Sequence, residues 1–220
     1  SFKIDAVDYP NARRINTKPM PSAGGLSIVI AFSIATLVFI PMLTSTAAPI
    51  KSYLSYTLPV VGAGWIIALT GLIDDVKELS AKKKMIGILL AASLVWFLTD
   101  FRLNDFKIPF GGPLLHFEPW LSYLLTVIWI VSITNAVNLI DGLDGLVSGV
   151  SIISLVTMGI VSYFFLPVPN LFLTMTIFVL VASIAGFFPF NYHPAILYLG
   201  DTGALFIGFM ISVLSLQGLK

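Results

Sequence analysis

The feature that most constrains this chain is a succession of long stretches without a charged residue. Six intervals contain no Asp, Glu, Lys or Arg: 23–50, 52–73, 85–99, 119–140, 145–200 and 202–219. A helix needs about 20 apolar residues to cross a bilayer, and a central Asp, Lys or Arg costs about 2.5–3.5 kcal/mol on insertion scales. Hydrophobic residues make up 57% of the chain, and its mean hydropathy is +0.97. We therefore predict an all-α fold, a polytopic membrane helix bundle.

The longest charge-free interval must hold two crossings. Residues 166–170 read Leu-Pro-Val-Pro-Asn, and proline interrupts a helix. About seven spans result, centred near residues 33, 64, 92, 127, 153, 179 and 210. Residues 101–118 alternate partly in polarity around Gly-Gly-Pro, which predicts a short extracytoplasmic β-hairpin. His116 there has no acidic or His partner at metal-ligand spacing, so we interpret it as a surface residue. We expect residues 1–220 to form a single transmembrane domain that is truncated at both ends.

The alternation of crossings predicts which loops share a membrane face. Loops 1–22, 74–84, 135–144 and 190–201 form one set, and they hold eight of the 12 Lys and Arg residues. The positive-inside rule predicts that this set is cytoplasmic, in a multi-pass protein of the inner (plasma) membrane. The net charge of +1 argues against a nucleic-acid partner, and the absence of cysteine excludes disulfides and thiolate metal sites.

Acidic residues in the same set of loops lie at helix ends and next to glycines. They form three groups: Asp74 with Asp75, Asp141 with Asp144, and Asp201. Each could be an ordinary helix cap, but glycines let backbone approach a ligand closely, and carboxylates are ligands for hard cations. Adjacent carboxylates repel each other, so a metal ion or a lysine between them would relieve the cost. We interpret the three groups together as a candidate catalytic site.

Several neutral and basic residues near these acids are candidate substrate contacts. Lys84 is the lysine best placed to reach a substrate phosphate. If the helix continued, a polar ridge of successive i,i+3 neighbours would form from Asn135, Asn138, Asp141 and Asp144. Tyr198 offers a flat face for a nucleobase, and Asn191 offers an amide for the edge of the base. His193 is a weaker acid–base candidate.

Four motifs, in this order along the chain, carry a resemblance to a known family. They are Asp8-Tyr-Pro-Asn with Lys18-Pro-Met-Pro-Ser-Ala-Gly-Gly, Asp74-Asp75-x-x-Glu78-Leu, Asn135-x-x-Asn138-x-x-Asp141-Gly-x-Asp144-Gly-Leu, and Phe190-Asn191-x-His193-Pro with Gly200-Asp201-x-Gly203. The chain resembles the polyprenyl-phosphate N-acetylhexosamine-1-phosphate transferases of glycosyltransferase family 4. It is most similar to the undecaprenyl-phosphate N-acetylglucosamine-1-phosphate branch, which is related to the phospho-N-acetylmuramoyl-pentapeptide transferases.

The resemblance implies a reaction and roles for the motif residues. N-acetylglucosamine 1-phosphate would pass from UDP-N-acetylglucosamine to undecaprenyl phosphate, with release of UMP, in an initiating step of teichoic-acid, lipopolysaccharide O-antigen or similar synthesis. The cofactor would be Mg²⁺, with Mn²⁺ as a substitute, and the lipid bilayer and a homodimer are compatible partners. The implied catalytic residues are Asp74, Asp75, Asp141 and Asp201, with Asp201 and Asp141 as metal ligands. The implied substrate contacts are Asn138, Asp144, Asn191, Tyr198, Lys84 and Lys18.

Three other functions compete with this interpretation. Phospho-N-acetylmuramoyl-pentapeptide transfer in peptidoglycan synthesis belongs to the same family. A secondary transporter would place its acids near the bilayer midplane, whereas these lie at helix ends. A CDP-alcohol phosphotransferase would have an arginine after its Asp-Gly pair, and none lies near Asp141.

Overall fold

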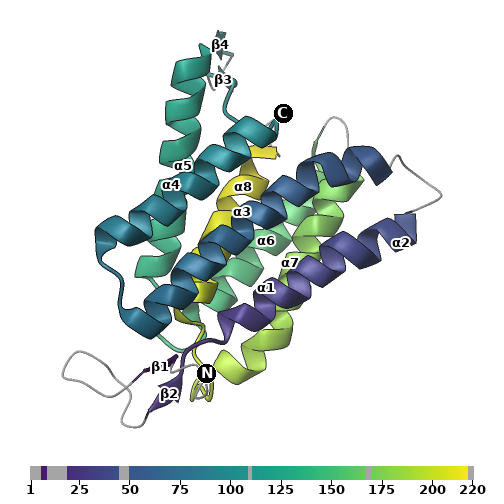
Figure 1. Ribbon diagram of the computed structural model, residues 1–220. Helices are drawn as coiled ribbons and strands as arrows, with labels where there is room; N and C mark the ends of the chain where they lie inside the picture. Colours follow the sequence, from purple (N-terminus) through teal and green to yellow (C-terminus); the bar gives the residue numbers. More distant parts are fainter. Residues whose placement is uncertain (1–5, 9–18, 45–49, 109–110, 167–169, 218–220) are drawn as a thin grey trace.

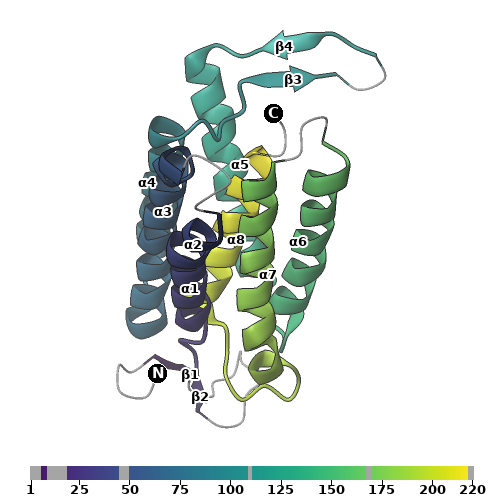
Figure 2. The same ribbon diagram turned by 90° about the vertical axis from the view of Figure 1, so that its right-hand side faces the viewer.

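The computed structural model describes residues 6–8, 19–44, 50–108, 111–166 and 170–217. Its elements, in chain order, are β1 (Val7–Asp8), β2 (Met20–Pro21), α1 (Gly25–Ile34), the π-helix η2 (Ala35–Phe39), α2 (Ile40–Thr44), α3 (Ile50–Lys77), α4 (Ala81–Leu98), β3 (Asp105–Lys107), β4 (Leu114–His116), α5 (Pro119–Leu139), α6 (Leu146–Phe164), α7 (Leu171–Asn191) and α8 (Gly200–Gln217). The helices run up and down the molecule, and α8 lies between the others (Figures 1 and 2).

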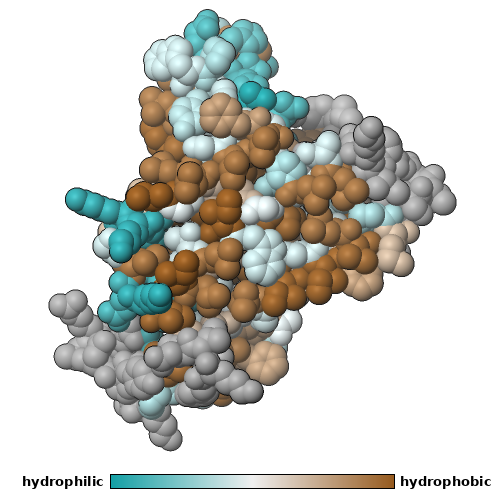
Figure 3. All heavy atoms as spheres, viewed as in Figure 1, coloured by the Kyte–Doolittle hydropathy of each residue, from teal (hydrophilic) through white to brown (hydrophobic). Residues whose placement is uncertain are grey.

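The predicted membrane bundle is confirmed. Six helical segments are long and apolar enough to span a bilayer: Gly25–Met42, Tyr53–Lys77, Pro119–Leu139, Leu146–Phe164, Leu171–Asn191 and Gly200–Gln217. The remaining predicted span is α4, which is 18 residues long and carries three lysines in its first turn. Hydrophobic residues form a broad band across the visible face of the molecule, as a lipid-facing surface requires (Figure 3).

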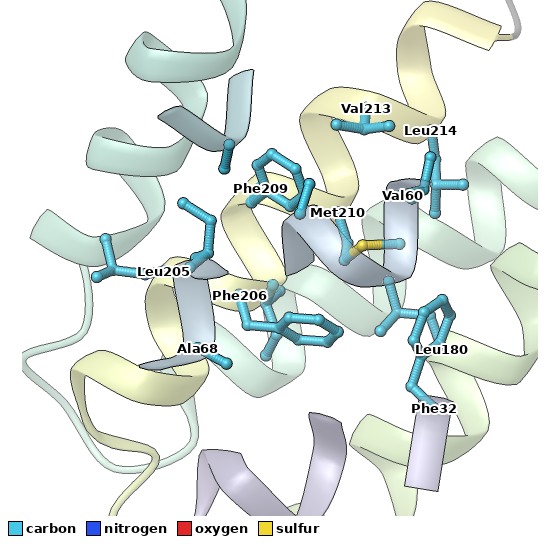
Figure 4. Packing of buried hydrophobic residues seen from close by; sticks show 14 of the residues in the cluster. Phe32, Val60, Ala68, Leu180, Leu205, Phe206, Phe209, Met210, Val213 and Leu214 are labelled. Carbon is cyan, nitrogen blue, oxygen red and sulfur yellow. The ribbon is translucent and has the colours of Figure 1, made fainter. Parts of the chain in front are cut away.

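The core of the bundle forms around α8. Nearly every residue from Thr202 to Leu214 is buried, and Phe206, Phe209 and Met210 face the surrounding helices (Figure 4). The ring of Phe206 meets that of Phe32 from α1 edge to face, with 5.8 Å between the ring centroids. Because α8 is enclosed by its neighbours, the position of its first residues is fixed by packing along the whole helix.

The strands bear out the predicted hairpin and add one pair that was not predicted. β3 and β4 pair antiparallel in the predicted hairpin. The loop before α1, for which no strand was predicted, contains a second antiparallel pair, β1 with β2. His116 is exposed, as predicted for a surface residue; its Nδ1 also lies 2.5 Å from Asp105 Oδ1, because the hairpin register places these residues opposite each other. The break between α6 and α7 is present, although residues 167–169 lie outside the described residues.

Parts of the four loops grouped by helix parity meet at one end of the bundle. The Tyr198 amide donates to Pro21 O (2.9 Å), and the Gly24 amide donates to Tyr198 O (3.1 Å), so the segment before α1 lies beside the segment before α8. The links from α3 to α4 and from α5 to α6 reach the same end (Figure 2). This end holds the candidate site.

Candidate active site

Lys84 connects two of the predicted carboxylates. Its Nζ lies 2.5 Å from Asp74 Oδ2 and 3.1 Å from Asp201 Oδ2. The link between α3 and α4 makes this arrangement, because the Leu79 amide donates to Asp74 Oδ1 (2.5 Å) and Glu78 adopts a positive φ of 47°. The chain therefore folds back tightly, and the first turn of α4 faces the last turn of α3. Lys84 is the only member of its lysine run whose side chain makes an ion pair among the described residues.

Asp75 holds the N-terminus of α8. Its Oδ1 accepts a hydrogen bond from the Asp201 amide (2.8 Å), and its Oδ2 accepts from the Thr202 amide (3.0 Å) and the Thr202 hydroxyl (2.6 Å). The first amides of a helix lack partners within the helix, and a carboxylate satisfies them while also interacting favourably with the helix dipole. The side chain that caps α8 thus comes from another helix, α3. By this cap, Asp75 fixes the position of Asp201.

Glycines allow the backbones around Asp201 to approach this closely. A Cβ on Gly71 would lie 2.6 Å from the carbonyl of Asp201, and a Cβ on Gly25 would lie 2.2 Å from Gly203. Neither glycine was identified as a site residue from the sequence, nor was Thr202. Their signal was present, since Gly25 and Gly203 belong to the quoted motifs and Thr202 follows Asp201 directly.

The motif between α5 and α6 supplies an amide and a further carboxylate. Asn138, in the last turn of α5, donates from Nδ2 to Asp201 Oδ1. The helix ends at Leu139, so the expected ridge does not continue, and the Asn135 amide instead bonds to Val131 O within its own helix (2.8 Å). Burial, together with repulsion from Asp201 and Asp75, raises the pKa of Asp141 to about 7. No hydrogen bond or ion pair to the Asp141 side chain is found among the described residues.

Asp144 and Asn191 tie the segment before α8 to its neighbours. Asp144 Oδ2 accepts from the Ala195 amide (3.1 Å) and lies 2.9 Å from His193 Nδ1. Asn191 is buried, accepts from the Ser148 hydroxyl (2.8 Å) and donates to Leu197 O (3.2 Å). In this arrangement the Asn191 amide is engaged at both ends, so its predicted contact with uridine stays a prediction.

Of the two remaining predicted substrate contacts, Tyr198 and Lys18, only Tyr198 lies among the described residues. Tyr198 is half-buried and lies beside Gly24 through their backbone hydrogen bond. Lys18 lies outside the described residues. The structure therefore brings Asp74, Asp75, Asn138, Asp141, Lys84 and Asp201 into one cluster. Asp144, between α5 and α6, and Asn191, the last residue of α7, both bond to the segment before α8.

The donor set fits a hard divalent cation. No three His, Cys, Asp or Glu side chains among the described residues are arranged to hold a metal ion. Mg²⁺, however, is bound through one or two carboxylates and completes its coordination with waters and substrate phosphates. Asp201 and Asp141 would hold it, since Asp141 has no other partner among the described residues and a cation would offset the repulsion that raises its pKa. Binding at Asp201 Oδ2 would require the Lys84 ammonium to move away from that oxygen.

Comparisons with known proteins match one family. Residues 57–219 match the model described as Glycosyl transferase family 4. The chain is 41% identical over 220 residues to the "Probable undecaprenyl-phosphate N-acetylglucosaminyl 1-phosphate transferase" of Bacillus subtilis, covering 100% of this chain and 57% of that protein. It is 34% identical to the "Decaprenyl-phosphate N-acetylglucosaminephosphotransferase" of Mycolicibacterium smegmatis, covering 98% of this chain and 54% of that protein.

A third relative bears the name of the competing reaction. The chain is 36% identical over 210 residues to the "Phospho-N-acetylmuramoyl-pentapeptide-transferase" of Staphylococcus saprophyticus, covering 90% of this chain and 62% of that protein. The chain thus spans a little over half the length of the curated relatives it matches.

Proposed function

This chain belongs to glycosyl transferase family 4, and we propose that it forms the membrane core of an enzyme that transfers N-acetylglucosamine 1-phosphate from UDP-N-acetylglucosamine to undecaprenyl phosphate. One observation carries the proposal: four carboxylates from three separate parts of the chain gather at one end of a membrane bundle, where a single lysine bridges two of them. The similarity to the Bacillus subtilis protein supports the choice of sugar and lipid, and the similarity to the Mycolicibacterium smegmatis protein supports the sugar and a polyprenyl phosphate.

The charge of the cluster suits two anionic substrates only when a cation is added. The cluster holds four carboxylates, those of Asp74, Asp75, Asp141 and Asp201, but only one ammonium group, that of Lys84, which contacts Asp74 and Asp201. Phosphate groups would be repelled by this excess of carboxylates. When bound at Asp201 and Asp141, Mg²⁺ would neutralise charge on the diphosphate and on the departing UMP.

The residues of the chain then hold and orient the reactants. An oxygen of the lipid phosphate attacks the phosphorus attached to the sugar, and the bond from that phosphorus to the bridging oxygen breaks, so UMP leaves with the bridging oxygen. A phosphate monoester has a second pKa near 6, so at neutral pH the attacking group needs no base. Asn138 fixes the Asp201 carboxylate through Oδ1, Asp74 directs the Lys84 ammonium, and Asp75 anchors the backbone of Asp201.

The location of the cluster matches the partition of the substrates. Asp74, Asn138 and Asp201 lie at the ends of spanning segments rather than midway along them, which does not favour a transporter site. A polyprenyl chain stays in the bilayer, while its phosphate meets a water-soluble nucleotide sugar at the rim. The excess of Lys and Arg in the loops that the sequence assigns to one membrane face supports a cytoplasmic site in the plasma membrane.

The proposal is tested with the full-length protein in detergent or liposomes. We expect UMP release from UDP-N-acetylglucosamine only when undecaprenyl phosphate and Mg²⁺ are both present, with the sugar and its phosphate recovered on the lipid. Asp201→Asn should abolish release, whereas Asp100→Asn, an exposed acid at the opposite end, should keep it. Release of UMP without the lipid would refute the transferase.

The identity of the donor separates the two reactions within the family. The similarity to the Staphylococcus saprophyticus protein makes UDP-N-acetylmuramoyl-pentapeptide the second donor to test. Turnover with that donor alone would replace N-acetylglucosamine transfer with the peptidoglycan reaction. Turnover with UDP-N-acetylglucosamine would instead support an initiating step of a cell-envelope glycopolymer such as teichoic acid or O-antigen.

A further inference from the structure

The β3–β4 hairpin has one apolar face and one polar face. Phe106 lies opposite Leu115 in the antiparallel register, so their side chains share a face, and Ile108 joins them by alternation. Lys107 and the ion pair between Asp105 and His116 lie on the other face, which is mostly polar although it also carries Leu114. Phe106 and Leu115 are 50% and 42% exposed.

The apolar face is directed toward the bundle rather than away from it. Asn104 precedes Phe106 by two residues and therefore lies on the same face, and its Oδ1 accepts a hydrogen bond from the Ser122 hydroxyl of α5 (3.0 Å). Ser122 is buried. The hairpin runs across the direction of the helices, beyond the end of α5 (Figure 2). Its apolar face thus lies at the level where α5 begins, on the side of the hairpin that faces the bundle.

Aromatic and basic side chains mark that level as a membrane interface. The Trp96 Nε1 donates to the Ser122 hydroxyl (3.3 Å), the Arg102 guanidinium lies 5.0 Å from the centre of the Trp96 ring, and Tyr123 packs edge to face against Trp96. Trp120, in the first turn of α5, is exposed. Tryptophan and tyrosine are enriched where the hydrocarbon core meets the head groups, and the long side chain of arginine can extend its charged end to the same zone.

We propose that the hairpin face bearing Phe106, Ile108 and Leu115 lies in the boundary between head groups and acyl chains of the leaflet farther from the carboxylate cluster. The occupant of this face is the lipid surface itself, because the face is continuous with membrane-spanning helices and begins at an aromatic belt. The hairpin joins α4 to α5, which carry Lys84 and Asn138 at their other ends. Its anchoring would fix how far both helices extend across the bilayer.

Single cysteines test the proposal, since the 220 residues contain none. In the full-length protein, any cysteine outside these residues is replaced by serine, and Phe106→Cys, Leu115→Cys and Leu114→Cys are made separately and spin-labelled. Each is reconstituted in vesicles of phosphatidylcholine and phosphatidylglycerol. Collisions of the label with oxygen, which concentrates in the bilayer, are compared with collisions with a water-soluble nickel chelate.

Leu114 is the matched control, since it adjoins Leu115, has the same side chain and is 51% exposed, but faces the other way. We expect oxygen to exceed nickel at positions 106 and 115 and the order to reverse at 114. Equal ratios at 114 and 115, or greater nickel access at 106, would refute the proposal. Poor access of both reagents would show a covering protein instead, and spin–spin broadening that disappears on dilution with unlabelled protein would show a second copy.

Discussion

Thr202 offers the sharpest test of how the site is held together. Its hydroxyl donates one of the three hydrogen bonds that the Asp75 carboxylate accepts from the first turn of α8. Thr202→Val keeps the shape of the side chain and removes only this bond. A hydrogen bond to a charged group contributes about 1.5–3 kcal/mol. If that free energy serves to hold Asp201 in place, kcat should fall roughly ten- to hundredfold, because about 1.4 kcal/mol corresponds to a tenfold change in rate.

The assay is UMP release by the full-length enzyme with Thr202→Val, Asp75→Asn and the double variant. If Asp75 acts through the first turn of α8, the double variant should lose much less than the product of the two single losses, because both changes break one interaction. Amide hydrogen exchange at residues 201–203 should quicken in the same variants. Thr157→Val is the control, since its hydroxyl is exposed and bonds only within α6.

Two results would refute this reasoning. Wild-type turnover in Thr202→Val would show that the hydroxyl does not help to position Asp201. Fully additive losses, with unchanged hydrogen exchange at the start of α8, would show that Asp75 acts on the substrates directly, as the family resemblance implies.

Three further predictions concern charge and packing in the cluster. Lys84→Met should lower thermal stability and abolish turnover, because the buried Asp74 would lose its partner. Lys83→Met, at an exposed position, should have little effect. Equal effects of the two substitutions in thermal unfolding and UMP-release assays would contradict this prediction. Gly71→Ala should lower the free energy of unfolding by about 1–3 kcal/mol, because the added methyl group would push α8 away. Gly62→Ala in the same helix, with open space around it, should be neutral or stabilising in thermal unfolding. A neutral Gly71→Ala would be inconsistent with the close approach of the two helices. Because the pKa of Asp141 is raised to about 7, the folded state binds the Asp141 proton more tightly than the unfolded state does. Without divalent cations, the melting temperature should therefore fall as the pH rises from about 4 to 7. The Asp141→Asn variant should lack this component of the pH dependence, and identical profiles in the two proteins would contradict the prediction.

The fold could be predicted because the bilayer imposes it. Charge-free intervals located the spans, and the prolines in 166–170 divided the longest one between α6 and α7. The hairpin followed from polarity and Gly-Gly-Pro. The pairing of β1 with β2 could not be foreseen, because two-residue strands have no periodicity and depend on the neighbouring segment before α8.

The candidate site could be predicted as a set of residues but not as a set of contacts. Helix parity and motifs selected Asp74, Asp75, Asp141 and Asp201, and they gather at one end. Which residues each side chain contacts depends on where the helices end. Because α5 ends at Leu139, Asn138 meets Asp201 while the Asn135 amide bonds to its own helix.

The adjacent acids of α3 show why a motif alone is insufficient. From the sequence, Asp74 and Asp75 would repel each other unless a cation lay between them. On a helix of 3.6 residues per turn, however, successive side chains point about 100° apart. Asp74 therefore meets the Lys84 ammonium of α4, and Asp75 meets the amides that begin α8. The cation bridges Asp74 to Asp201 rather than Asp74 to Asp75, so one pair of neighbouring carboxylates joins three helices around a single position, that of Asp201.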